Sequence, residues 1–463
     1  MIDGLKPYPE YKPSGLPWLA RVPSHWRVVR NGSLFAQRNQ IGFAHLPILE
    51  VSLRTGVRVR DFETPARKQV MSDFAKYKRA AQGDLAYNMM RMWQGAVGVV
   101  PVDGLVSPAY VVVRPYADVF APYYAYLFRT DDYMSEVDAF SRGIVKDRNR
   151  LYWDQFKQMP SPCPDPDEQA AIVRFLDYAN GRLERAIRAK RKVIALLNEQ
   201  KQAIIHRAVT RGLDPTVPLK PSGIPWLGDI PQHWEMRRLR FCIRDKLTYG
   251  ANAAAEFDNP DWPRYLRITD FSADGSLRPD TFRSLPPAVA KDYLVEDGDI
   301  LFARSGATVG KAFLVRTDTV KACFAGYLIR ARPDTRVVLP TFLFAFTQST
   351  AFACWKDAVF NQATIQNIGA DKYANLSVPI PPHPEQHAIL ESVEKEVAPI
   401  RAASGRIDRE IELLREYRTR LVADVVTGKL DVRSATSQLP AEPIEPEPTP
   451  DLEELTELEE AEA

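Results

Sequence analysis

EQAAIVRFLDYANGRLERAIRAKRKVIALLNEQKQAIIHRA, residues 168–208, is the stretch of sequence that decides the fold. Apolar residues recur in it every three or four positions, while Arg, Lys and Glu occupy the remaining positions. The seam is formed by Ile172, Leu176, Ala179, Leu183, Ala186, Val193, Leu197, Ile204 and Ala208. The spacing predicts one long amphipathic helix.

A second run of the same kind covers residues 385–426. Its apolar seam consists of Ile389, Val393, Val397, Ile400, Ile407, Ile411, Leu414, Leu421 and Val425. A lone amphipathic helix of this length cannot bury its apolar stripe, so the simplest arrangement has the two helices bury each other. The alternative is a pair of unrelated surface helices, which the matching sequences around the two runs disfavour.

Those flanking sequences reveal an internal repeat. Pro166-Asp167-Glu168-Gln169 opens the first helical run and Pro384-Glu385-Gln386 opens the second. Thr210-Arg211-Gly212-Leu213-Asp214 closes the first run, and Thr427-Gly428-Lys429-Leu430-Asp431 closes the second. Upstream, KPSGLPWL at 12–19 recurs as KPSGIPWL at 220–227, and His25-Trp26 recurs as His233-Trp234. The chain is therefore one unit, a globular part followed by a helix, written twice.

These landmarks predict an α+β protein with two pseudo-symmetric mixed α/β domains separated by two long helices that form an antiparallel coiled coil. The expected boundaries are 1–165 for the first domain, 166–212 for the first helical region, 213–380 for the second domain, 381–432 for the second helical region and 433–463 for an acidic, disordered tail. Between the landmarks the two copies differ widely, which suggests one frame that reads two different targets.

Length and composition set the broad class. A chain of 463 residues with 45% hydrophobic residues is long enough for two to four domains with real cores. No apolar run approaches the 18 residues of a membrane span, and no signal peptide is evident. The four cysteines show no metal-ligand spacing and read as a reduced set. We therefore expect a cytoplasmic protein with no membrane association.

The net charge of +2 conceals an uneven distribution. The segment 440–463 contains ten of the 59 Asp and Glu residues and none of the 61 Lys and Arg residues, so the remainder carries +12. A body this basic is compatible with nucleic-acid binding, although many surface cations only keep a protein soluble. The tail reads as a solubilising segment, with a regulatory role as the alternative.

A search for catalytic motifs is largely negative. Gly306-Ala307-Thr308-Val309-Gly310-Lys311 resembles a phosphate-binding loop, but only three residues separate the glycines and Ala312 follows the lysine. There is no Asn-Pro-Pro-aromatic methyltransferase motif and no His or Cys cluster with metal spacing. His25 and His233 sit beside tryptophans, where packing or hydrogen bonding is favoured over catalysis. We expect no catalytic residues and no metal site in this chain.

The residues at 90–98, MRMWQGAVG, and at 106–110, VSPAY, resemble the first recognition domain of the specificity subunits of type I restriction–modification systems. The segment FARSG at 302–306 and the proline-rich run into Glu-Gln before each helix resemble that family too. The resemblance covers residues 11–432. It implies two target-recognition domains, each reading half of a split DNA site, and a non-catalytic role in phage defence through DNA methylation.

The same resemblance implies several partners. These are double-stranded DNA, two modification (methyltransferase) subunits, and restriction (helicase-nuclease) subunits. It implies no cofactor on this chain, because S-adenosylmethionine, ATP and Mg²⁺ would belong to the partner subunits. The alternative function is a coiled-coil scaffold, or another DNA-binding adaptor without restriction function. A self-contained nuclease or methyltransferase is disfavoured by the missing motifs.

Base edges are read best by Arg, Lys, Asn and Gln, and phosphates accept hydrogen bonds from any basic or small polar group. For each candidate the structural alternative is a salt bridge or a hydrogen bond that holds a loop. The candidate DNA-binding residues in the first domain are Arg91, Gln94, Ser141, Arg142, Lys146 and Arg148. Those in the second are Arg304, Ser305, Gln362, Thr364 and Gln366. A further basic group, Arg54, Arg58, Arg60, Arg67 and Lys68, fits a phosphate track or a solvated face.

Overall fold

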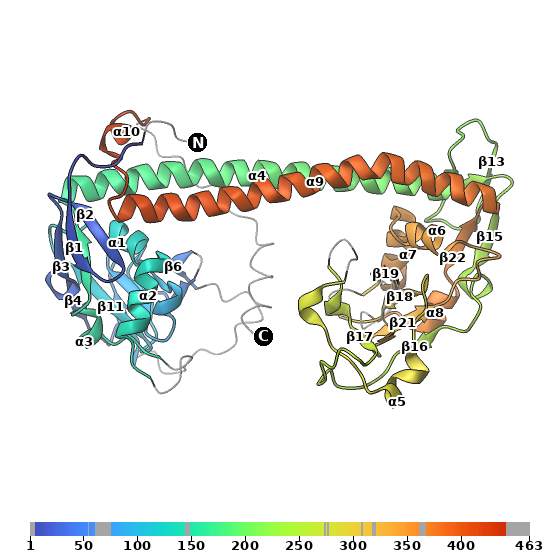
Figure 1. Ribbon diagram of the computed structural model, residues 1–463, viewed down its shortest axis with the longest axis horizontal. Helices are drawn as coiled ribbons and strands as arrows, with labels where there is room; N and C mark the ends of the chain where they lie inside the picture. The colour runs from blue at the N-terminus through green and yellow to red at the C-terminus, as the bar shows by residue number, and fades with distance from the viewer. Residues whose placement is uncertain are drawn as a thin grey trace. The chain divides into compact units, whose positions relative to one another are not determined.

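The computed structural model describes residues 5–53, 55–60, 76–143, 149–272, 275, 277–306, 309–316, 321–360 and 367–440. They form two compact units, which we treat one at a time (Figure 1). Unit 1 takes its residues from Met1–Lys190 and Arg409–Ala463, and unit 2 from Arg191–Asp408. Each unit has its own hydrophobic core and contributes to the same two long helices. The predicted fold class is confirmed.

The two long helices are α4 (Pro166–Arg211) and α9 (His383–Val426). Helix α4 begins with a proline, whose missing N–H would have no partner in the first turn, and the Asp165 carboxylate accepts a 2.9 Å hydrogen bond from the Glu168 amide. Both helices are followed by glycines with positive φ, Gly212 at 73° and Gly428 at 76°. A left-handed residue at this point satisfies the last carbonyls of a helix, which explains the repeated glycine.

Within each unit the two helices pair antiparallel. In unit 1, Glu184 of α4 forms an ion pair with Arg418 of α9 at 3.2 Å, and the later Lys190 pairs with the earlier Glu410. The core of unit 1 places Ile172 and Leu176 in one cluster with Leu421 and Val425. In unit 2, Ile205 and Val209 share a core with Ile389, Val393 and Val397.

One position of the predicted seam is wrong. Val193 is 44% exposed, whereas Ile187 is only 3% exposed and Ile194 is half-buried. The sequence pattern offers Val193 and Ile194 side by side, and a helix turns by about 100° per residue, so only one of two neighbours can face the partner helix.

Unit 1 is built around the four-stranded antiparallel sheet β4-β11-β8-β9, onto which short helices pack. Four further two-stranded pairs, β1-β2, β10-β7, β12-β3 and β5-β6, complete the unit. The strands are β1 (Tyr11–Leu16), β2 (Leu19–Pro23), β3 (Arg27–Arg30), β4 (Phe35–Arg38), β5 (Leu49–Ser52), β6 (Gly56–Val59), β7 (Lys78–Ala80), β8 (Leu85–Asn88), β9 (Val97–Val99), β10 (Gly104–Val106), β11 (Tyr110–Pro115) and β12 (Pro160–Cys163). The helices are α1 (Ala121–Leu127), α2 (Asp131–Phe140) and α3 (Trp153–Phe156).

Unit 2 repeats this plan with the sheet β16-β21-β18-β19, in which β18 and β21 are the central strands. It differs in carrying a parallel pair, β17-β20. The strands are β13 (Leu219–Pro221), β14 (Asp229–Pro231), β15 (Glu235–Arg238), β16 (Thr248–Tyr249), β17 (Arg264–Leu266), β18 (Ile300–Ala303), β19 (Ala312–Leu314), β20 (Ala322–Phe324), β21 (Leu328–Ala331) and β22 (Ser377–Ile380). The helices are α5 (Pro287–Ala290), α6 (Pro340–Thr347), α7 (Thr350–Phe360) and α8 (Ala370–Ala374).

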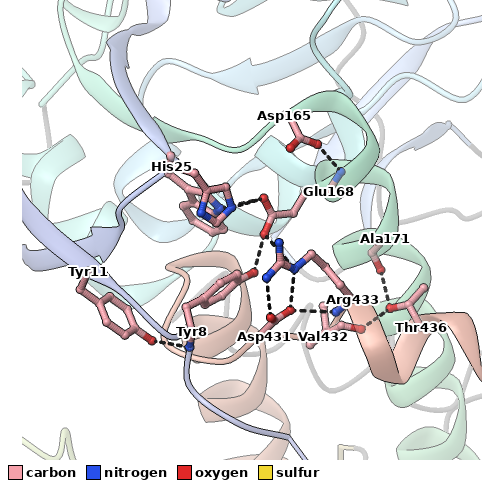
Figure 2. A network of polar contacts seen from close by, with 11 residues as sticks. Tyr8, Tyr11, His25, Asp165, Glu168, Ala171, Asp431, Val432, Arg433 and Thr436 are labelled. Atoms are coloured by element: carbon pink, nitrogen blue, oxygen red, sulfur yellow. Dashed lines mark hydrogen bonds and ion pairs between the residues drawn. The ribbon is translucent and has the colours of Figure 1, made fainter.

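The repeated Glu-Gln pair at the start of each long helix fastens the helix to its domain. The Glu168 carboxylate accepts a hydrogen bond from Tyr8 Oη at 2.7 Å and contacts His25 Nε2 at 2.8 Å (Figure 2). It also accepts a hydrogen bond from Trp26 Nε1 at 3.0 Å. Burial, followed by the hydrogen bond to Glu168, raises the pKa of Tyr8 far above its usual value, so its hydroxyl stays a donor. In unit 2, Glu385 makes the equivalent contacts to His233 at 2.7 Å and Trp234 at 3.0 Å.

The glutamines have an equally regular role. Gln169 Oε1 accepts the Phe120 amide at 2.8 Å just before α1, and Gln386 Oε1 accepts the Leu339 amide at 2.8 Å just before α6. Each glutamine also donates from Nε2 to the carbonyl five residues before it, that of Pro164 or Pro381. Backbone groups that would otherwise be buried without partners are satisfied in this way, so the motif is structural.

The segment after α9 begins differently from the predicted disordered tail. Residues Arg433–Ser437 form the short helix α10, and Thr436 Oγ1 donates to the Ala171 carbonyl of α4 at 3.1 Å. Arg433 pairs with Asp431 at 2.7 Å (Figure 2), and Asp431 forms a β-bridge with Lys6. The expected boundary at 433 therefore lies too early, because residues 433–440 contact unit 1. Residues 441–463 lie outside the described part.

Candidate nucleic-acid interface

The same turn precedes β8 and β18, which are central strands of the two four-stranded sheets. In each turn a buried aspartate holds the backbone in place. Asp84 is 2% exposed and accepts a hydrogen bond from the Ala81 amide at 2.9 Å, while Arg38 pairs with both of its oxygens. Asp299 is 1% exposed and is bound in the same way by the Glu296 amide at 2.8 Å and by Arg332. Gly83-Asp84 and Gly298-Asp299 are thus a further repeated pair, and they position β8 and β18 and the residues that follow these strands.

In unit 1 the chain leaving β8 is held by two backbone hydrogen bonds. The Met89 amide donates to the Ala109 carbonyl at 3.1 Å, and the Met89 carbonyl accepts from the Leu151 amide at 2.9 Å. The candidate Arg91 follows as an exposed residue, and Gln94 lies exposed in a single 3₁₀ turn. These contacts bring the segment after β8 beside the segment around Arg150.

The second candidate segment of unit 1 is anchored by a pair of arginines. Arg142 and Arg150 face each other in an antiparallel bridge, with backbone hydrogen bonds of 3.1 and 3.0 Å in the two directions. Both residues are exposed. Among the described residues no carboxylate pairs with Arg91, Arg142 or Arg150. Unit 1 therefore presents three exposed guanidinium groups on neighbouring segments.

The other candidates of unit 1 are divided. Ser141 ends helix α2, and its Oγ donates to the Val137 carbonyl at 2.7 Å, so the structural alternative describes its hydroxyl. Lys146 and Arg148 lie outside the described residues, as do Arg54, Arg67 and Lys68. Arg58 forms an ion pair with Glu50 at 2.8 Å, which favours the solvated-face interpretation for that residue.

Unit 2 repeats the geometry with different side chains. The Arg304 amide donates to the Tyr327 carbonyl at 3.0 Å, and the Arg304 carbonyl accepts from the Ile368 amide at 2.9 Å. Ser305 forms an antiparallel bridge with Asn367. The Arg304 guanidinium lies 4.9 Å from the centre of the Tyr249 ring, and its buried Nε has no hydrogen-bond partner among the described residues. Gln362, Thr364 and Gln366 lie outside the described part of the chain.

These backbone contacts define which residues correspond between the units. Met89 and Arg304 make the same two hydrogen bonds, and the donor to their carbonyls is Leu151 in unit 1 and Ile368 in unit 2. The structural counterpart of Arg304 is therefore Met89, which lies six residues after its glycine just as Arg304 does, and Arg91 lies two residues further along. The frame is the same in both units, while the side chains it presents differ.

The sequence interpretation missed four residues of this region: Arg150, Asn367, Tyr249 and Tyr327. Tyr249 and Tyr327 are 43% and 65% exposed, and the Tyr249 hydroxyl accepts the Ala370 amide at 3.0 Å. A signal for Arg150 and Asn367 did exist. The constant offset that relates Glu168 to Glu385 also relates Leu151 to Ile368, and it pairs these two residues with each other.

Other polar clusters offer less. A cavity of about 330 Å³ in unit 2 is lined by His233, Glu235, Arg237, Arg336 and His383, with four further residues. Its two arginines are neutralised, since Arg237 pairs with Glu235 at 2.7 Å and Arg336 with Asp334 at 2.7 Å. Within the described residues, no group of three His, Cys, Asp or Glu is placed to hold a metal ion, and no helix is long and apolar enough to cross a bilayer.

Comparisons with known proteins find similarity to DNA specificity subunits. Residues 265–412 match the family described as the type I restriction modification DNA specificity domain. The chain is similar to the EcoBI specificity subunit of Escherichia coli, with 23% identity over 280 residues that cover 58% of each protein. It is also similar to the StySPI specificity subunit of Salmonella potsdam, with 22% identity over 210 residues that cover 44% of each.

A solved structure shares the fold. One chain from a study of complex assembly and conformational transition in a type I restriction–modification system aligns with a TM-score of 0.62 and 15% identity, covering 88% of this chain and 99% of that one. The aligned regions span only about half the length of the curated relatives, 58% of the EcoBI subunit and 44% of the StySPI subunit.

Proposed function

We propose that the chain is a specificity subunit of a type I restriction–modification system and that it binds an asymmetric, bipartite DNA target with one unit per half-site. The observation that carries this proposal is the pair of corresponding loop clusters. In both units the segment leaving the central strand meets the segment before a short helix, and this region presents Arg91, Arg142 and Arg150 in unit 1 but Arg304, Ser305 and Asn367 in unit 2. Equivalent backbones with different hydrogen-bonding side chains suit two half-sites of different sequence.

Electrostatics support the same proposal. The body of the chain carries a net charge of +12 once the acidic segment 440–463 is set aside. The three arginines of unit 1 have no carboxylate partners among the described residues, so they are available to phosphates or base edges. The buried Nε of Arg304 adds a donor that a bound acceptor would satisfy.

In this function the chain supplies recognition, and the chemistry belongs to its partners. We propose that two methyltransferase subunits bind along the paired helices, once per repeat, and that restriction subunits complete the complex. S-adenosylmethionine, ATP and Mg²⁺ would be bound by those subunits. The repeated contacts of Glu168 and Glu385 support two equivalent attachment regions, because they fasten each domain to its helix in the same way.

The test is the methylation motif produced by the chain together with its methyltransferase. We expect a two-part motif, and we expect Arg304→Ala to relax one half while the other stays intact. Gln362→Ala with Gln366→Ala should act on that same half. Each lost bidentate contact should cost about 1–3 kcal/mol of discrimination. Equal degradation of both halves would show that the units do not each read one half-site.

The second candidate function is an adaptor or coiled-coil scaffold, favoured only by the length of the paired helices. DNA binding separates the two functions. The affinity of a specificity subunit for DNA should fall steeply as the salt concentration rises, because it makes several phosphate contacts. A scaffold without a DNA role should not bind DNA at any salt concentration.

A further inference from the structure

Arg150 and Asn367 occupy one corresponding position in the two units. Each directly precedes a fully buried aliphatic residue, Leu151 or Ile368, whose amide donates to the segment leaving the central strand. Side chains alternate in extended chain, so a residue next to a buried neighbour points away from the core. Both Arg150 and Asn367 are accordingly exposed.

The backbone at this position is fixed by hydrogen bonds on both sides. Arg150 is bridged to Arg142 by a reciprocal pair of bonds, and Asn367 is bridged to Ser305. A short helix begins three residues later in each unit, α3 after Arg150 and α8 after Asn367. These helices pack Phe156 and Tyr373 into the cores of unit 1 and unit 2. A fixed backbone favours base recognition, because the residue loses less conformational entropy when its side chain binds a base.

The side chains of Arg150 and Asn367 are available to bind a ligand. Among the described residues neither the Arg150 guanidinium nor the Asn367 amide has a hydrogen-bond partner in the protein. Asn375, by comparison, accepts hydrogen bonds from Arg238 and Arg240 and is thereby occupied. A structural role in holding a loop, the usual alternative for a surface arginine or asparagine, is therefore not served by these two side chains.

We propose that Arg150 and Asn367 are equivalent base-reading residues, Arg150 for a guanine in one half-site and Asn367 for an adenine in the other. The assignment follows from hydrogen-bond geometry in the major groove. The arginine fork matches the O6 and N7 acceptors of guanine, and the asparagine amide matches the N6 donor and N7 acceptor of adenine. The inference rests on the proposed function and adds to it the residues and bases concerned.

An exchange of the two side chains tests the inference. Arg150→Asn and Asn367→Arg are made separately in the full chain, which is co-expressed with its methyltransferase, and methylation is measured on a randomised duplex library. Arg150→Asn should move one position of one half-site from guanine toward adenine. Asn367→Arg should move one position of the other half-site from adenine toward guanine. The preference at the affected position should change by roughly ten- to a hundred-fold, the range expected for one bidentate contact.

Two control variants make an identical change (Arg to Asn) and a closely similar one (a side-chain amide to Arg) elsewhere. Arg114→Asn alters an exposed arginine in β11, four residues beyond Tyr110 and paired with Ala36. Gln232→Arg adds a charge to an exposed residue between β14 and β15 of unit 2. Both controls should leave the motif of the unchanged chain.

The outcomes separate the inference from the function on which it rests. If Arg150→Asn and Asn367→Arg leave every position of a bipartite motif unchanged, the base-reading roles are overturned and the proposed function still stands. A uniform loss of methylation on all sequences, without a change in preference, shows that these side chains contact only phosphates and also overturns the inference. If the unchanged chain directs no bipartite motif at all, the proposed function itself fails.

Discussion

At the scale of single residues, Glu168 and Glu385 are the same residue of the repeat in two different settings. The Glu168 side chain is 2% exposed and has Tyr8, His25 and Trp26 as partners, whereas the Glu385 side chain is 27% exposed and hydrogen-bonds to His233 and Trp234. A carboxylate surrounded by donors is costly to alter when water cannot reach it.

We therefore expect Glu168→Gln to lower the free energy of unfolding by about 1–3 kcal/mol, because the amide would turn a donor toward other donors. Glu385→Gln should cost less, since solvent can take up the misplaced donor. Urea unfolding of the full chain measures the loss, and hydrogen exchange in β3 and β15 assigns it to a unit. Equal losses from the two variants would contradict this account.

Residue-scale reasoning from sequence was strongest where the repeat marked a residue and weakest in the loops. The roles of His25 and His233 as structural residues follow from their tryptophan neighbours and the repeat. Arg91 is a basic residue of the kind that reads bases, yet the backbone makes Met89 the counterpart of Arg304. Only the hydrogen bonds across segments distant in sequence show this correspondence.

At the scale of elements, the long helices were the most predictable part. Their apolar period and glycine stops gave boundaries close to α4 and α9. The seam was less well defined, since Val193 is exposed and Ile187 is buried. The parallel pair β17-β20 was not foreseen, because its short strands leave no long alternating pattern and pair across more than fifty residues.

The corrected seam gives a direct prediction. Ile187→Ala should destabilise the chain by about 2–5 kcal/mol, as expected for truncation of a buried aliphatic side chain. Val193→Ala should stay within about 0.5 kcal/mol, because the side chain already meets solvent. Thermal and urea unfolding of both variants measure the difference. If Val193→Ala lowers the free energy of unfolding as much as Ile187→Ala does, the seam predicted from the sequence is correct and the revised seam is wrong.

At the scale of the whole molecule, each unit closes its own core, and both units draw on the same two helices. Arg409 and Arg415 of unit 1 and Lys192 of unit 2 are exposed on those helices, whereas Arg188 of unit 1 is half-buried. Apolar side chains are exposed beside them, including Leu196 at 54% and Leu413 at 64%. Charged and apolar groups together suit a protein–protein contact.

The triple variant Lys192→Glu, Arg409→Glu and Arg415→Glu should reduce co-purification of the methyltransferase by roughly ten-fold or more at low salt, because like charges across an interface are strongly unfavourable. A matched triple, Lys12→Glu, Arg30→Glu and Arg114→Glu, reverses exposed charges of unit 1 away from the helices and should not affect assembly. Undiminished recovery of the methyltransferase with the first triple would exclude these three residues as partner contacts.

The discontinuity of unit 1 has a consequence for how the protein is made. Unit 2 is a continuous stretch of 218 residues, whereas unit 1 needs residues 409–432 to cover Ile172, Leu176 and Tyr123. At about 5–20 residues per second, a ribosome that has finished residue 190 works for roughly 10–45 seconds before residue 409 appears. During that interval unit 1 is translated but open along one apolar face, and unit 2, though later in the chain, can be the first to close. Aggregation during synthesis, and the protection that chaperones give against it, should therefore concentrate on the first unit to leave the ribosome.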